Sequence, residues 1–180
     1  MSPAPALVMG PDCADPAIAP GIHIWGWMSN VELHWLHDTA ATMGSVAEIG
    51  VLRGRSAFAL LTGCPGPVYC VDPWHDPGGH ALRGFKEACG HFPNLVTVQG
   101  WSPAAAARVP DVDMTFIDGD HSYESAMADI AAWLPKTRRL ICGHDYSDLE
   151  GFPGVKQAVD EVFGDRATLA PFTSIWAVGL

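Results

Sequence analysis

The feature that most constrains the fold of this chain is a regular alternation between short apolar runs and amphipathic stretches. Five apolar runs have the length of buried strands, and each is followed by a stretch whose apolar residues recur at helical spacing. Strand, helix, strand repeated in this way predicts a parallel sheet with right-handed crossovers. The predicted strands are Ser45–Ile49, Val68–Val71, Leu95–Val98, Val112–Ile117 and Leu140–Cys142, and the predicted helices lie near residues 55–62, 79–90, 103–108, 123–134 and 154–163.

The last part of the chain has a different pattern. Ala167–Ala170 and Ser174–Val178 are strand-like runs joined by a few residues around Pro171. So short a link permits only an antiparallel pair. We therefore predict an α/β fold with three layers, in which a mostly parallel, seven-stranded sheet ends in an antiparallel hairpin.

The length of 180 residues fits a single domain, and the chain shows no internal repeat. Residues 1–28 are rich in Pro, Ala and Gly and lack periodicity, so we predict an N-terminal arm there. Ser29 followed by Glu32 is a capping-box signature for a helix over residues 30–42. The predicted core spans residues 45–180.

The charge and the cysteines exclude several classes of function. Ten basic against twenty acidic residues give a formal net charge of −10. Phosphate backbones and anionic lipids repel such a protein, so we expect a small-molecule partner, no nucleic acid and no membrane. The five cysteines are odd in number and form no C-x-x-C pair, which argues against a disulfide framework or a thiolate zinc site. With no signal peptide or membrane-spanning stretch in the sequence, we expect a cytoplasmic location.

A glycine-containing loop follows the first predicted strand, and an acid ends the second. Gly50 lets the backbone turn tightly and approach a ligand, although such a turn is often purely structural. Asp72, at the second strand end, can accept both hydroxyls of an adenosine ribose. The spacing E-x-G-x-x-x-G differs from the G-x-G-x-x-G of dinucleotide enzymes. Loop and acid together predict a cofactor that carries adenosine.

The segments V-A-E-I-G-V-L-R-G-R-S and Y-C-V-D-P-W resemble the first two motifs of class I S-adenosylmethionine-dependent methyltransferases. The resemblance implies a Rossmann-like fold with S-adenosylmethionine as the cofactor. It places Glu48 near the amino-acid end of the cofactor and the adenine contacts at the end of the third strand. The cofactor-binding candidates are Glu48, Gly50, Gly54, Ser56, Asp72, Trp74, Gln99, Ser102 and Asp118.

Carboxylates and imidazoles follow the fourth and fifth predicted strands. D-G-D-H-S-Y-E begins at Asp118, and G-H-D-Y begins at Gly143. These strands should be neighbours at the carboxyl edge of the sheet, where open α/β folds bind ligands. Such a set can hold a divalent metal. The alternative for Asp120 or Ser122 is capping of the helix that begins near residue 123.

Together with G-V-K-Q-A-V-D-E at residues 154–161, these motifs are similar to macrocin-type and cephalosporin-pathway O-methyltransferases over residues 46–163. The resemblance implies a divalent ion, Mg or Mn, held by Asp118, His144 and Asp145. His144 stands where several relatives carry a carboxylate, and imidazole suits Mn better than Mg. By the same resemblance, the general base is His121 or Asp120.

The predicted reaction is in-line methyl transfer from S-adenosylmethionine to a hydroxyl of a small-molecule acceptor, assisted by the divalent ion. Two alternatives stay open. One is a metal-independent methyltransferase in which His144 is the base; the other is a non-catalytic nucleotide-binding module. The chain has little sequence for an acceptor lid, so a homodimer is the assembly that we expect if a partner subunit completes the pocket.

Overall fold

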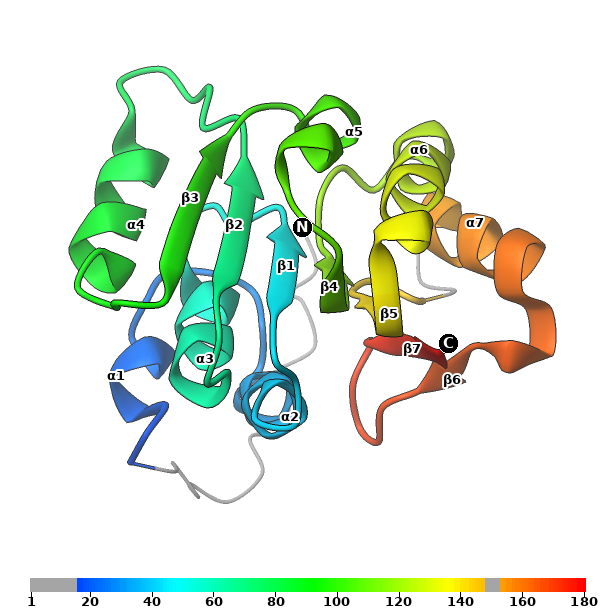
Figure 1. Ribbon diagram of the computed structural model, residues 1–180, viewed down its shortest axis with the longest axis horizontal. Helices are drawn as coiled ribbons and strands as arrows, with labels where there is room; N and C mark the ends of the chain where they lie inside the picture. Colours follow the sequence, from blue (N-terminus) through cyan, green and yellow to red (C-terminus); the bar gives the residue numbers. More distant parts are fainter. Residues whose placement is uncertain (1–15, 148–152) are drawn as a thin grey trace, which may run out of the picture.

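The computed structural model describes residues 16–147 and 153–180, which form a seven-stranded sheet with helices on both faces (Figure 1). The strand order is β3-β2-β1-β4-β5-β7-β6. The first five of these pair in parallel, and β7 pairs antiparallel with both β5 and β6. This confirms the predicted Rossmann-like α/β fold. The strands are β1 Val46–Ile49, β2 Val68–Asp72, β3 Leu95–Gln99, β4 Val112–Ile117, β5 Thr137–Gly143, β6 Thr168–Leu169 and β7 Trp176–Gly179.

Helices cover both faces of the sheet, and the side chains of each strand point alternately towards one face and the other. In β1, Val46 packs in one hydrophobic cluster, whereas Ala47 and Ile49 pack in a second cluster on the opposite face. The first cluster includes residues of α2, α3 and α4, and the second includes residues of α5, α6 and α7. The α-helices are α1 Ala19–Ile22, α2 Asn30–Ala40, α3 Arg55–Gly63, α4 His80–Cys89, α5 Ser102–Ala105, α6 Tyr123–Trp133 and α7 Pro153–Phe163; short 3-10 turns are η1 Ala106–Arg108, η2 Leu134–Lys136 and η3 Gly164–Arg166.

The N-terminal segment is more ordered than the sequence predicts. Residues 1–15 of the predicted arm lie outside the described residues, but residues 16–28 include α1 and a fully buried Ile18. Gly21 of α1 lies against the ring of Phe58 in α3. Burial of Ile18 stabilises this helix. With four residues, α1 is too short to show a hydrophobic periodicity in the sequence. The predicted capping box of α2 is confirmed, with Ser29 and Glu32 each accepting from the other's backbone N–H.

The C-terminal strands pair antiparallel as predicted, with shifted bounds. Both residues of β6 are exposed, and Trp176 and Val178 of β7 are buried. β7 lies between β5 and β6, so it is held on both edges. None of the helices in residues 16–147 and 153–180 has the length and apolar character needed to cross a bilayer.

Candidate active site

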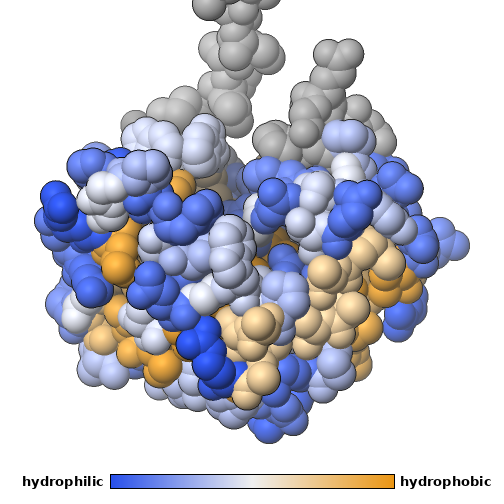
Figure 2. Space-filling model, turned by 90° about the horizontal axis from the view of Figure 1, so that it is seen from above, coloured by the Kyte–Doolittle hydropathy of each residue, from blue (hydrophilic) through white to orange (hydrophobic). Residues whose placement is uncertain are grey.

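A cavity of about 1240 Å³ opens at the carboxyl ends of the parallel strands. Loops after β1, β2, β3, β4 and β5 line it, together with residues 25–28 of the N-terminal segment. Figure 2 looks onto this end of the molecule, whose surface is largely hydrophilic with separate hydrophobic patches. Three exposed tryptophans also line the cavity: Trp25, Trp27 and Trp101. The volume is large enough for a cofactor together with a second small molecule.

The glycine loop after β1 brings backbone directly against the loop after β4. Gly50 has φ +83°, and a Cβ atom there would clash with the carbonyl oxygen of Asp118. The positive φ and this close approach both require glycine. Gly50 and Ser56 line the cavity as predicted. Gly54, with φ +89°, does not: it packs against Phe85 and Cys89, so its role is to seat α4 against α3.

Asp72 organises the loop that the cofactor would contact. Its Oδ2 accepts the N–H groups of Val51 and Leu52, each over 2.9 Å, and its Oδ1 accepts the N–H of Trp74 over 2.7 Å. A carboxylate offers about four acceptor positions, so capacity for a ribose hydroxyl remains. Trp74 stacks on Phe85 with ring centroids 5.0 Å apart and donates through Nε1 to the Leu52 carbonyl. Both Asp72 and Trp74 line the cavity.

The two candidates after β3 have different positions. Ser102 lines the cavity, and its hydroxyl accepts from Trp133 Nε1 over 2.9 Å. Gln99 is absent from the lining, and its side chain donates to the Pro73 carbonyl. The structure therefore assigns Gln99 to holding the loop after β2. Trp101, which follows β3, is 63% exposed at the cavity.

Glu48 does not reach the cavity, contrary to the sequence prediction. Its side chain is fully buried beneath the glycine loop, and Cys70 Sγ donates to it over 3.6 Å. Burial raises the pKa of Glu48 to about 8; a hydrogen bond with Ser56 opposes this, and the charges of Asp118 and Asp72 add to it. At neutral pH its carboxyl group is therefore mostly protonated.

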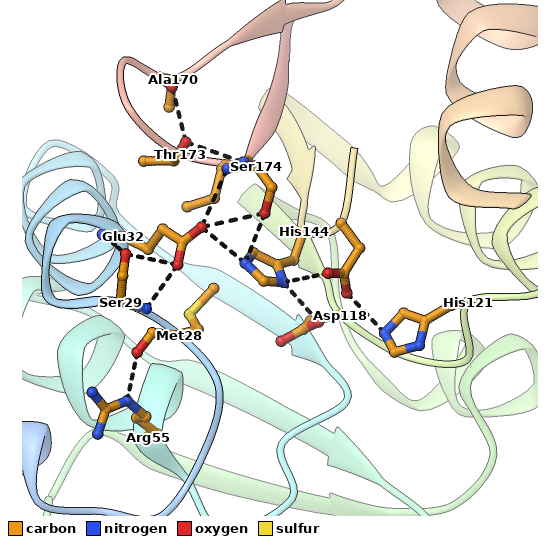
Figure 3. Close-up of polar contacts among 12 residues, drawn as sticks. Met28, Ser29, Glu32, Arg55, Asp118, His121, His144, Ala170, Thr173 and Ser174 are labelled. Carbon is orange, nitrogen blue, oxygen red and sulfur yellow. Dashed lines mark hydrogen bonds and ion pairs between the residues drawn. The ribbon is translucent and has the colours of Figure 1, made fainter. Parts of the chain in front are cut away.

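The acids and histidines after β4 and β5 meet at one side of the cavity, as predicted. The parallel register places Ile117 beside Gly143, so the residues that follow emerge side by side. His121 Nε2 lies 2.8 Å from Asp145 Oδ2. His144 Nδ1 lies 3.2 Å from Asp145 Oδ1. It lies 3.7 Å from Asp118 Oδ1, and both His144 and Asp118 are labelled in Figure 3. All four residues line the cavity.

His144, the predicted metal ligand and alternative base, is engaged on both sides of its ring. Its Nε2 lies 3.0 Å from Glu32 Oε1 and 3.0 Å from the Ser174 hydroxyl. Burial alone would lower the pKa of His144, but hydrogen bonds to Asp145 and Glu32 and the charge of Asp118 raise it to about 10. A protonated imidazole donates from both nitrogens, which matches the carboxylates found on the two sides of this ring.

Glu32 and Ser174 contact His144 from outside the cavity lining, a connection that the sequence did not predict. Burial would raise the pKa of Glu32, but the hydrogen bond and positive charge of His144 lower it to about 2. In the sequence, Glu32 is already explained by the capping box, so nothing there points to its contact with His144. Nothing near Ser174 marks it, since its contact with His144 depends on the path of the C-terminal hairpin.

The remaining acid–base candidates differ in environment. Asp120 Oδ1 accepts the N–H and the hydroxyl of Ser122, over 2.9 and 2.5 Å, and these bonds lower its pKa. Ser122 in turn caps α6, so Asp120 belongs to the start of that helix. A hydrogen bond with Asp145 raises the pKa of His121. Burial raises the pKa of Asp118 to about 6.

A group of three residues has the arrangement of a metal site. Asp118, His121 and Asp145 can each offer one ligand atom, and these atoms lie within 4.8 Å of one another. Two carboxylates and one imidazole are donors that Mn²⁺ accepts readily. The donor set thus fits a divalent ion, with His121 in this group instead of the predicted ligand His144.

Comparison with known proteins places this site in a family. Residues 47–146 match a family model described as a methyltransferase domain, and no curated protein matches the sequence. Similar solved structures include a protein from Corynebacterium glutamicum, with a TM-score of 0.69 and 19% identity over 92% of this chain and 89% of that one. An O-methyltransferase from Bacillus cereus, in complex with S-adenosylhomocysteine, has a TM-score of 0.64 and 18% identity over 86% and 83%. The O-methyltransferase TomG from Streptomyces achromogenes, involved in tomaymycin synthesis and in complex with S-adenosylmethionine, has a TM-score of 0.62 and 15% identity over 92% and 90%. The matched family model covers the glycine loop, Asp72 and both strand ends of the acid–histidine cluster, and the chain belongs to the class I, Rossmann-like family of S-adenosylmethionine-dependent methyltransferases.

Proposed function

We propose that this protein transfers the methyl group of S-adenosylmethionine to a hydroxyl oxygen of a small molecule, with the help of a divalent ion. The observation that carries the proposal is one continuous cavity whose lining includes Gly50 and Asp72, the candidates for cofactor binding, together with Asp118, His121 and Asp145. Solved neighbours whose descriptions name them O-methyltransferases support it.

The cofactor would lie along the glycine loop. Gly50 lets the loop after β1 turn against the Asp118 backbone, Asp72 would accept from ribose hydroxyls, and Trp74 and Ser102 line the same cavity. S-Adenosylmethionine supplies an already activated methyl group, so the protein contributes orientation and proton removal.

The acceptor hydroxyl would lie next to Asp118, His121 and Asp145, which would hold the divalent ion. A bound divalent ion would supply positive charge that lowers the pKa of the hydroxyl, whose proton would then pass to water in the cavity. Asp120 lines the cavity beside this set, and the bonds from Ser122 that lower its pKa make it the weaker proton acceptor. We therefore assign Asp120 to holding Ser122, the N-cap residue of α6.

A metal-independent reaction is the second candidate, and one contact favours it. His121 Nε2 lies 2.8 Å from Asp145 Oδ2, an arrangement in which the carboxylate orients the imidazole as a general base. In this version His121 takes the proton itself, and His121→Ala would lower kcat by about 10²–10⁴-fold. Methyl transfer that persists in excess EDTA, with no metal found by elemental analysis, would select this candidate.

Cofactor binding is tested by calorimetry with S-adenosylhomocysteine. We expect the wild type to bind and Asp72→Ala to bind about 10–100-fold more weakly, because the variant loses a charged hydrogen-bond acceptor worth about 1.5–3 kcal/mol. Asp38→Ala, which changes an acid on α2 whose side chain is 75% exposed, is the matched control and should bind like the wild type. A wild type that does not bind would refute the proposed function, and unchanged affinity in Asp72→Ala would refute the role of Asp72.

A further inference from the structure

Glu32 is joined through His144 to residues that lie over eighty positions away in the sequence. Its Oε1 lies 3.0 Å from His144 Nε2 and accepts the N–H and the hydroxyl of Ser174 over 3.2 and 3.3 Å. Its Oε2 accepts the N–H and the hydroxyl of Ser29 over 2.8 and 2.9 Å. Both oxygens of this buried carboxylate are therefore fixed, and Oε1 faces the active site (Figure 3).

The opposite edge of the His144 ring contacts both carboxylates of the proposed metal site. Nδ1 lies 3.2 Å from Asp145 Oδ1 and 3.7 Å from Asp118 Oδ1. Asp145 also has φ +59°, a conformation that residues other than glycine seldom adopt, so outside contacts must hold it in place. His144 is thus a bridge from Glu32 to the two acids, and His121 is a second partner of Asp145.

We propose that Glu32 is a positioning residue, which acts through His144 to orient Asp118 and Asp145 for a divalent cation. The inference rests on the proposed metal site and adds two elements to it: α2, which carries Glu32, and the β6–β7 connection, which carries Ser174. Partners that hydrogen-bond to metal ligands fix the orientation of those ligands, and their loss commonly weakens metal binding 10–100-fold.

Glu32 also caps α2, so a structural role must be separated from a positioning role. The chain offers variants for this purpose because the two oxygens have different partners. Ser29→Ala removes a partner of Oε2 only, and Ser174→Ala removes a hydroxyl from Oε1 and His144 only. Glu32→Gln has one side-chain oxygen instead of two. Its NH₂ group must therefore face the donors either of Ser29 or of His144 and Ser174, which then lack an acceptor.

The experiment is calorimetry of Mn²⁺ binding to the metal-stripped full chain at saturating S-adenosylhomocysteine. We expect Glu32→Gln to bind Mn²⁺ about 10–100-fold more weakly than the wild type. Ser174→Ala should also bind more weakly, whereas Ser29→Ala should lose thermal stability and keep the wild-type affinity for Mn²⁺. The affinity for S-adenosylhomocysteine should be unchanged in all three, which also shows that each variant is folded.

Two results would overturn the inference, and they bear differently on the proposed function. Unchanged Mn²⁺ affinity in Glu32→Gln, or in Ser174→Ala if Glu32→Gln does not fold, refutes the positioning role. If Asp145→Ala then abolishes Mn²⁺ binding, the metal site itself stands. A wild type that binds S-adenosylhomocysteine but no Mn²⁺ refutes both the inference and the metal-assisted mechanism, and leaves the metal-independent candidate.

Discussion

Glu48 is the acid directly before the glycine loop, and its side chain is fully buried between α3 and the sheet. The protonated form is favoured there, because burial raises the pKa of the group from 4.5 to about 8. The unfolded chain instead releases the proton near the ordinary value. Glu48 therefore contributes stability that is fully present below about pH 4.5 and is lost as the pH rises towards 8.

We expect Glu48→Gln to flatten the pH dependence of stability between about pH 5 and 8, since the amide cannot ionise. In this window the wild-type free energy of unfolding should fall relative to that of the variant by at most about 1.4 kcal/mol per pH unit. Urea denaturation at several pH values measures both slopes, and comparing the two proteins cancels the other titrating groups. Parallel slopes would show that Glu48 ionises normally in the folded protein.

Among the elements, the N-terminal segment depends on a single side chain of α3. Arg55 donates to the backbone carbonyls of Ile22, Ile24 and Met28. Residues 25–28 line the cavity, so this side chain fixes one of its walls. A planar guanidinium with several donors can hold three carbonyls at once, which lysine cannot do in the same geometry.

We expect Arg55→Ala to release residues 22–28 without unfolding the sheet. Hydrogen exchange of these amides should become faster, and the free energy of unfolding should fall by about 1.5–3 kcal/mol. Arg138→Ala is the control, because Arg138 lies on β5 with a side chain that is 59% exposed and pairs with Asp111 rather than with the N-terminal segment. Equal exchange in the two variants would show that Arg55 does not anchor the segment.

The sequence predicted what depends on local spacing and strand order. The capping box of α2 and the meeting of Asp118 with Asp145 follow from signals within a few residues and from adjacent parallel strands. The predictions from the sequence were incomplete where contacts depend on packing between segments that are distant in the chain. Glu32 and His144 are 112 positions apart, and Glu32 and Ser174 are 142 apart, so no local pattern connects them. Glu48 was misplaced for a related reason: its position in a motif does not show which face of the sheet its side chain takes.

At the scale of the whole molecule, the proposed function implies two ligands in one cavity, the cofactor and a divalent cation. The free energy of unfolding should therefore depend on both. The acids near Asp118 give the cavity a negative side, and the chain carries a formal net charge of −10. Both the sulfonium cofactor and a divalent cation are favoured by such a field. Each ligand binds the folded chain and stabilises it by an amount that grows with the logarithm of its concentration relative to its dissociation constant.

We expect S-adenosylhomocysteine and Mn²⁺ to raise the melting temperature separately. A ligand at 100 times its dissociation constant adds about 2.7 kcal/mol. EDTA should remove only the Mn²⁺ increment, and Asp145→Ala should lack that increment while keeping the other. Differential scanning fluorimetry measures all of these combinations. An Mn²⁺ increment that survives in Asp145→Ala would place the ion elsewhere.

The position of β7 between β5 and β6 has a consequence for the order of events during translation. Ribosomes deliver a chain from its N-terminus, and early segments begin to fold before later ones exist. Here β5 emerges long before β7, its neighbour in the sheet, and His144 emerges before Ser174. Until residues 174–179 have been synthesised, β5 exposes an unpaired edge and the bridge from Glu32 to His144 lacks Ser174. Nascent chains stalled before this point should therefore rely on chaperones, because an open strand edge is a template for aggregation.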